Sequence, residues 1–168
     1  AWFARDDSFD LRCRAFEAAH HAAARGELDA WAGDAEGALA LCLLLDQIPR
    51  NLYRGSAHAF ATDPLARATA ARAIDAGHDQ ATDEALRIFF YLPFEHAESM
   101  MEQERSVALF TALARELQAP AFDSALEYAV RHRDVITRFD RFPHRNDILS
   151  RPSTAEEIEL LKQPGSSF

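Results

Sequence analysis

Hydrophobic positions recur at spacings of three and four residues along most of the chain, which is the pattern of amphipathic helices. The first such stretch is expected to begin at a cap on Ser8 and to end at Arg25-Gly26, a cation followed by glycine. No stretch shows the sustained alternation of β-branched and polar residues that is typical of a strand. The pattern therefore predicts an all-α protein.

The most hydrophobic part of the chain leads directly into a polar segment. Ala38–Leu45 is apolar at every position, so the helix that Asp34 is expected to cap is predicted to be central and buried on all sides. A proline then disfavours helix at the residue before it and starts a new turn. We call residues 46–55 the first junction. Its Arg50 and Arg54 lie four residues apart on one helix face, where we expect them either to be solvated or to form an anion-binding corner.

The rest of the chain predicts helices over Leu65–Ala76, from Thr82 to about Pro93, from Pro93 to about Leu117, over Ala121–Phe139 and over Thr154–Lys162. Two of their starts carry specific signals. Asp63-Pro64 is a cap followed by proline at the first helical position, and the run from Ser153 to Glu156 matches a capping box.

The helix expected after Pro93 carries polar groups on an otherwise apolar stripe. His96 and Gln103 fall on the same stripe as Phe110. An unpaired buried polar group costs about 1–3 kcal/mol, so the two polar side chains predict either an internal polar network or a ligand pocket. We call residues 91–98 the second junction. The other face is expected to be solvated and carries a row of charged residues: Glu95, Glu98, Glu102 and Arg105.

A second histidine, His132, lies beside the apolar stripe of the helix Ala121–Phe139. The third junction, residues 140–146, follows that helix. Like the first junction, it contains an aspartate, an apolar residue, a proline and an Arg-Asn pair. The similarity indicates a weak internal repeat, as in a helix–turn–helix array.

Composition and charge exclude several classes of protein. The 168 residues, 48% of them hydrophobic, suit one all-helical domain over residues 1–168, and only six glycines and seven prolines interrupt it. A formal net charge of −9 argues against nucleic acid as a partner. No apolar run reaches the ~18 residues of a membrane span. No signal peptide is recognisable, and Cys13 and Cys42 are expected to be free buried thiols, as in a cytoplasmic protein.

Several motifs are spread along the whole chain: Trp2-Phe3, Leu45-Asp46-Gln47-Ile48-Pro49-Arg50-Asn51, Tyr91-Leu92-Pro93-Phe94-Glu95-His96-Ala97-Glu98, His132-Arg133-Asp134, Phe142-Pro143-His144-Arg145-Asn146 and Arg151-Pro152-Ser153-Thr154. Together they resemble the bacterial domain-of-unknown-function 924 family. The resemblance implies an α-α superhelix, a tetratricopeptide-repeat-like array of antiparallel helices, and it implies no assigned reaction. Family members begin earlier with another aromatic-rich helix, so the resemblance also implies that this chain lacks a typical N-terminal segment.

The leading hypothesis is a pocket for a small, anionic ligand where the three junctions meet. Alternate junctions of a helical array can lie at the same end, so polar residues far apart in sequence can share a site. The acid/base candidates are His96, His132 and Glu95, because histidine titrates near neutral pH. The candidates for ligand binding are Arg50, Asn51, Arg54, Glu98, Gln103, His144, Arg145 and Asn146. The residues fit both a binding pocket alone and a pocket with acid/base chemistry.

Two other interpretations remain beside the pocket. Tetratricopeptide-like arrays bind peptides or proteins in a concave groove without catalysis. Alternatively, the arginine, glutamate and histidine side chains hold the junctions together as a structural network. The chain has no HExxH, paired ExxH or CxxC motif, so no metal site is predicted. The sequence names no cofactor, no particular ligand and no oligomeric state.

Overall fold

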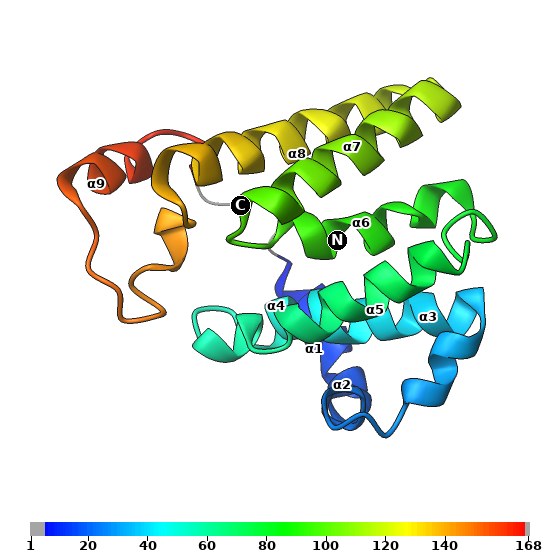
Figure 1. Cartoon of the computed structure of the whole chain (residues 1–168). Helices are drawn as coiled ribbons and strands as arrows, with labels where there is room; N and C mark the ends of the chain where they lie inside the picture. Colours follow the sequence, from blue (N-terminus) through cyan, green and yellow to red (C-terminus); the bar gives the residue numbers. More distant parts are fainter. Residues whose placement is uncertain (1–5, 167–168) are drawn as a thin grey trace. The chain divides into compact units, whose positions relative to one another are not determined.

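The structure, a computed structural model, describes residues 6–166 and consists of helices, turns and loops (Figure 1). No strand occurs among these residues, which confirms the predicted all-α fold class. None of the helices within that range is long and apolar enough to cross a membrane. The Trp2-Phe3 motif lies outside the described residues. The tetratricopeptide-like superhelix stays a prediction.

Contacts between residues divide the chain into two compact units, Ala1–Pro93 and Phe94–Phe168. That residues 1–168 form a single domain stays a prediction. The helices of the first unit are α1 (Asp7–Cys13), α2 (Glu17–Ala24), α3 (Ala35–Cys42), α4 (Ile48–Leu52), α5 (Asp63–Asp75) and α6 (Ile88–Glu95), whose last two residues belong to the second unit. The helices of the second unit are α7 (Met100–Leu117), α8 (Pro120–Phe139) and α9 (Ala155–Leu161).

The helix starts of the first unit follow the expected capping chemistry with two shifts. Asp6, rather than Ser8, caps α1: its carboxylate accepts the backbone N–H of Ser8 at 3.0 Å. Asp34 caps α3 as predicted and accepts the N–H of Gly37 at 2.8 Å. Asp63 is the first residue of α5 rather than its cap. Each shift moves a boundary by one or two residues and leaves the helix in place.

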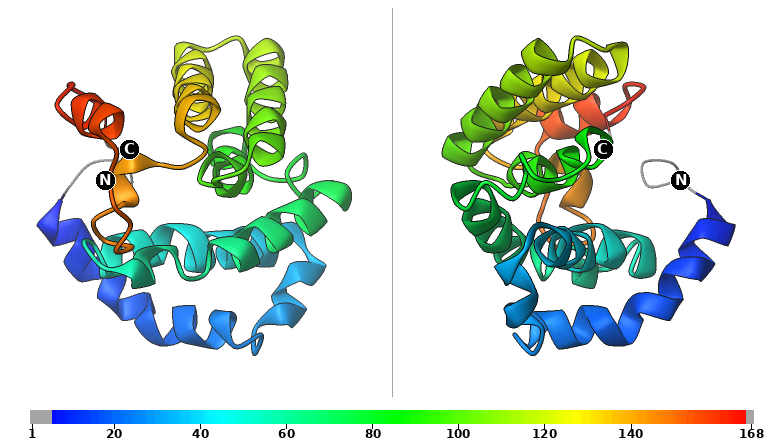
Figure 2. Two further views of the ribbon diagram at one scale, coloured as in Figure 1. Left: turned by 60° about the vertical axis from the view of Figure 1, so that its left-hand side comes forward. Right: turned by 90° about the vertical axis from the view of Figure 1, so that its right-hand side faces the viewer.

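The core of the first unit is built on α3 and the turn that follows it. Leu41, Leu44, Leu45 and Ile48 are buried there, and α3 packs against α5 (Figure 2). Burying a leucine or isoleucine side chain contributes about 1.5–3 kcal/mol, so this segment is the main source of stability in the unit. The helix is central as predicted, but the prediction of burial on all sides is wrong, because Leu39, Ala40 and Leu43 are only partly buried. Both cysteines are buried and free, as expected.

A π-helical turn, Leu43–Gln47, connects α3 to α4. Pro49 has no N–H to donate to the carbonyl of Leu45. The hydroxyl of Thr62 donates to that carbonyl instead, at 2.6 Å, and is itself buried. A side chain from the start of α5 therefore replaces the backbone hydrogen bond that proline removes, and it fixes the first junction against α5.

The second junction differs from the prediction. Pro93 lies inside α6, not in the first turn of a new helix, and α7 begins at Met100 after an extended Ser99. Phe90 and Phe94 on either side of the proline are buried, and their burial offsets the one backbone hydrogen bond that Pro93 cannot make. The helix predicted to start at Thr82 also begins later in the sequence, at Ile88. His96 therefore lies in a connection between two helices.

The second unit is organised around an antiparallel pair of helices, α7 and α8 (Figures 1 and 2). The tight turn between them places Gln118 in the left-handed region, with φ 47°. Phe110 and Leu113 of α7 and Ile136 of α8 are buried, so the apolar stripes predicted for both helices form the core of this unit. The segment after α8 carries the third junction and leads to α9.

Candidate functional site

The end of α6 and the middle of α8 bring together a buried carboxylate and a buried imidazole. Nδ1 of His132 lies 3.2 Å from Oε1 of Glu95 and 2.8 Å from the backbone carbonyl of Tyr128, one turn earlier in α8. The side chains of Glu95 and His132 are both almost fully buried. Glu95 was expected on a solvated face; that prediction is wrong, because α6 extends through Pro93 and turns residue 95 inward.

The surroundings of His132 keep its imidazole neutral. The pKa of His132 is lowered to about 3, mainly by burial and also by the nearby His96, Arg145 and His144, whereas the hydrogen bond to the carbonyl of Tyr128 acts to raise it. A carbonyl can only accept, so the neutral ring carries its proton on Nδ1 and its lone pair on Nε2. The ring is therefore in the tautomer of a general base whose Nδ1 is held by the protein.

The third junction surrounds this pair with further rings and a cation. The rings of His96 and His132 lie 6.4 Å apart, and His132 meets the ring of Phe142 edge-on at 5.6 Å. His144 lies 5.7 Å from Phe142, and the guanidinium of Arg145 lies over the same ring at 4.6 Å. We call Glu95, His96, His132, His144 and Arg145 the histidine cluster. All five were predicted, and the second unit brings them together.

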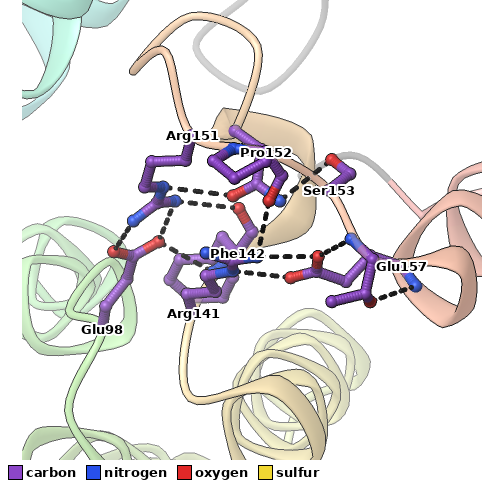
Figure 3. A network of polar contacts seen from close by, with 9 residues as sticks. Glu98, Arg141, Phe142, Arg151, Pro152, Ser153 and Glu157 are labelled. Atoms are coloured by element: carbon purple, nitrogen blue, oxygen red, sulfur yellow. Dashed lines mark hydrogen bonds and ion pairs between the residues drawn. The ribbon is translucent and has the colours of Figure 1, made fainter.

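Glu98 belongs to a separate network that holds the third junction in place (Figure 3). Its carboxylate accepts two hydrogen bonds from Arg151, at 2.6 and 2.8 Å, and one from the N–H of Phe142 at 2.7 Å. Burial would raise the pKa of Glu98, but these hydrogen bonds lower it. Asn146 accepts from Arg151 and donates to Ser153. Glu98 is therefore half-buried and paired, not solvated as expected.

The same network continues to α9 through a second ion pair. Arg141 donates to both oxygens of Glu157, at 2.6 and 2.8 Å, and hydrogen bonds from Arg141 lower the pKa of that buried carboxyl to about 2 (Figure 3). The capping box is formed by Thr154 and Glu157, one residue later than the predicted Ser153 and Glu156. The sequence is compatible with a capping box at either position. The structure favours the later one, in which Glu157 also pairs with Arg141.

Gln103 has internal partners. It is fully buried, and its Nε2 donates to the carbonyls of Glu95 at 2.6 Å and Ala97 at 2.8 Å. These carbonyls flank His96, at the point where α6 has ended and has no further N–H to offer. Gln103 thus fixes the backbone around His96.

Arg50 of the first junction is held by two carboxylates of the first unit. Its Nη1 lies 2.9 Å from Asp63 and 3.1 Å from Asp46, and its Nη2 donates to Asp63 at 3.1 Å. Both carboxylates are buried, and the arginine side chain is 17% exposed. Such a buried ion pair contributes little net free energy to folding, but removing one partner leaves a buried charge uncompensated. The expectation of a solvated Arg50 is wrong.

Arg54 and Asn51 are also paired within the first unit. Arg54 donates to both oxygens of Asp10, at 2.7 and 3.1 Å, and to Oδ1 of Asn51 at 2.7 Å. Asn51 in turn donates to the carbonyl of Gln47 at 2.8 Å. The sequence distance of 44 residues between Arg54 and Asp10 hides this pair from any local pattern. That the first junction joins the other two in one site stays a prediction.

Two of the hollows formed by residues 6–166 are large enough to describe. One of about 450 Å³ is lined by Arg138, Phe139, Asp140, Arg141, Thr154, Glu156 and Glu157. Another of about 200 Å³ is lined by Ala23, Ala24, Gly26, Asp29, Leu45, Leu65, Ala68, Thr69 and Arg72. Neither lining includes a residue predicted for the site. Among residues 6–166, no group of three or more His, Cys, Asp or Glu side chains is arranged to hold a metal ion.

Sequence reasoning missed Arg151, which organises Glu98, Asn146 and the backbone of Phe142. Its signal was its place in the Arg151-Pro152-Ser153-Thr154 motif, which the resemblance covered without assigning it a role. Tyr128 was missed as well, because it contributes only a backbone carbonyl.

Comparison with known proteins adds a family and no activity. No curated protein matches the chain. A solved structure, of the protein of unknown function ATU0120 from Agrobacterium tumefaciens, is 52% identical and has a TM-score of 0.88, covering 96% of this chain and 88% of that one. The model of a family described as bacterial protein of unknown function, DUF924, matches residues 1–165, and the chain belongs to that family.

Proposed function

We propose that the second unit binds a small anionic molecule at the histidine cluster and takes up a proton when it does so. The observation that carries the proposal is the buried, neutral His132, held by Glu95 and the carbonyl of Tyr128 and surrounded by His96, His144 and Arg145. A structural core has little use for several titratable rings around one buried base, whereas sites of acid/base chemistry are built in this way.

The charges explain why protonation accompanies binding. The guanidinium of Arg151 is matched by the carboxylate of Glu98 in a bidentate pair. Arg145 and the imidazoles of His96 and His144 would supply positive charge to a bound anion. An anion close to His96 and His144 stabilises their protonated forms, so binding becomes stronger as the pH falls through the usual range of histidine.

The same arrangement supports acid/base chemistry on the bound molecule. His132 has the tautomer of a general base, and Glu95 stabilises the imidazolium that forms when His132 accepts a proton. Glu95 acts through His132 and is a positioning residue. Phe142 excludes water from one edge of the ring, which strengthens both interactions.

The test is a titration of the histidine side-chain NMR signals of the full chain with sodium phosphate and with sodium acetate at pH 6 and pH 8. We expect saturable shifts of the His96, His132 and His144 signals, with tighter binding at pH 6. His144→Gln should weaken binding, whereas His78→Gln, a change in the first unit, should leave it unchanged. Shifts that do not saturate, or that are equal for His78 and the cluster, refute the proposal.

A peptide-binding scaffold is the second candidate. The observation that favours it is the antiparallel pair α7 and α8, the element that tetratricopeptide arrays repeat to form a groove. Tyr128 on α8 and Met101 on α7 are large and exposed. Binding of a peptide that is weakened by Tyr128→Ala and insensitive to His144→Gln would favour the scaffold over the anion site.

A further inference from the structure

The smaller hollow lies within the first unit and is formed by four segments. The end of α2 contributes Ala23 and Ala24, the segment after it contributes Gly26 and Asp29, and the π-helical turn contributes Leu45. One face of α5 completes it with residues at helical spacings of three, four and seven: Leu65, Ala68, Thr69 and Arg72. Three of its nine lining residues are alanines (Ala23, Ala24 and Ala68), and their short side chains leave space unfilled.

The hollow is apolar inside and polar at its edge. Ala23, Leu45 and Thr69 are buried, so its floor is two apolar side chains and one hydroxyl-bearing side chain. Asp29 and Arg72 are exposed and lie at the rim. A volume of about 200 Å³ is below the roughly 300–1,000 Å³ of sites for drug-sized ligands, and it suits a molecule of amino-acid size.

The two charges at the rim have opposite signs and are not matched by other side chains. Within residues 6–166, neither Asp29 nor Arg72 has a side-chain hydrogen bond or an ion pair, with each other or with any third residue. This contrasts with Arg50 and Arg54 in the same unit, whose guanidinium groups are paired with carboxylates.

The backbone at Gly26 shapes this rim. Its φ of +77° lies in the left-handed region, as expected for the glycine that ends a helix. A Cβ at this position would lie 3.4 Å from Oδ2 of Asp29. Glycine thus allows the turn that brings the carboxylate of Asp29 to the mouth of the hollow.

We propose that this hollow binds a small zwitterion of the α-amino acid class with an apolar side chain. The carboxylate of the ligand pairs with the guanidinium of Arg72, and its ammonium group pairs with the carboxylate of Asp29. The apolar side chain enters the space over Ala23 and Leu45. The site lies in the first unit and goes beyond the function proposed for the histidine cluster, so either proposal stands if the other fails.

The test uses L-leucine and probes that each lack one of its three features. Glycine lacks the apolar side chain, 4-methylpentanoate lacks the ammonium group and 3-methylbutylamine lacks the carboxylate. Each is titrated into the full chain by calorimetry. We expect saturable binding of L-leucine, at least about tenfold tighter than that of any of the three, because a hydrogen bond to a charged group is worth about 1.5–3 kcal/mol.

Two variants assign the charges. Arg72→Gln should weaken L-leucine about tenfold and leave 3-methylbutylamine unchanged, whereas Asp29→Asn should weaken L-leucine and leave 4-methylpentanoate unchanged. Arg67→Gln and Asp75→Asn, on α5 and outside the lining, are the matched controls and should bind like the parent protein. The proposal is overturned if L-leucine shows no saturable binding, or if both rim variants bind it as the parent does.

Discussion

Acidification should destabilise the protein through His132, and the size of the effect follows from its burial. In the unfolded chain the imidazole titrates at its ordinary value near 6.5, whereas in the folded protein its pKa is about 3. The unfolded state therefore binds more protons between these values, and stability falls as the pH falls through 6.5 towards 3. At pH 5 the loss relative to pH 8 is about 2 kcal/mol at most from this residue.

Urea denaturation at pH 8 and at pH 5, followed by circular dichroism, measures this loss. His132→Gln keeps a donor for the carbonyl of Tyr128 and cannot be protonated, so the stability of this variant should change less between the two pH values than that of the parent. His58→Gln, at an exposed position, is the control and should retain the full pH dependence. If the parent and His132→Gln lose the same free energy of unfolding, His132 is not a buried neutral imidazole and the reasoning about the cluster is wrong.

Three further changes test the contacts that position the site. Glu98→Gln should lower the free energy of unfolding by about 2 kcal/mol, because it removes the negative charge that pairs with Arg151. Glu102→Gln on α7 is its control, and equal losses of stability in the two variants would contradict the network. Thr62→Val should cost about 1–3 kcal/mol in thermal unfolding, since the carbonyl of Leu45 is then buried without a donor, and a smaller cost would mean that water replaces the hydroxyl. Thr154→Ala should cost α9 about 1 kcal/mol of local stability, visible as faster amide hydrogen exchange in that helix alone.

The helices themselves were predictable because apolar spacing and capping residues are local signals. Ala38–Leu45 is apolar throughout and supplies much of the core of the first unit, and α8 begins and ends within a residue of the predicted Ala121–Phe139. The prediction failed at Pro93, where the local rule places proline in a first turn. The burial of Phe90 and Phe94 outweighs that rule, and burial depends on segments that are distant in sequence.

The candidate site was predictable in its residue types and less so in its pairing. His96 and His132, predicted near apolar stripes, lie with their rings 6.4 Å apart in the second unit, and their role in a site stays a prediction. The partners of the arginines did not follow from the sequence, because Arg54 pairs with Asp10 across 44 positions and Arg151 pairs with Glu98 across 53. Local spacing places two arginines on one helix face, but it does not show whether carboxylates of the same chain form ion pairs with them.

Within residues 6–166, two histidines are buried, and their surroundings bear on the function proposed for the cluster. His20 and His132 are both buried, both have a pKa lowered mainly by burial, and both place Nδ1 at 2.8 Å from a backbone carbonyl, that of Leu44 and of Tyr128 respectively. The carbonyl of Leu44 is the hydrogen-bond partner of Nδ1 in His20, and the charge of Glu17 raises the pKa of that ring against the effect of burial. His132 has in addition the carboxylate of Glu95 at 3.2 Å, whose burial is costly and which the ring does not need in its neutral form. The two rings therefore differ in that His132 has a carboxylate within ion-pair distance, and the proposal that His132 accepts a proton rests on that contact.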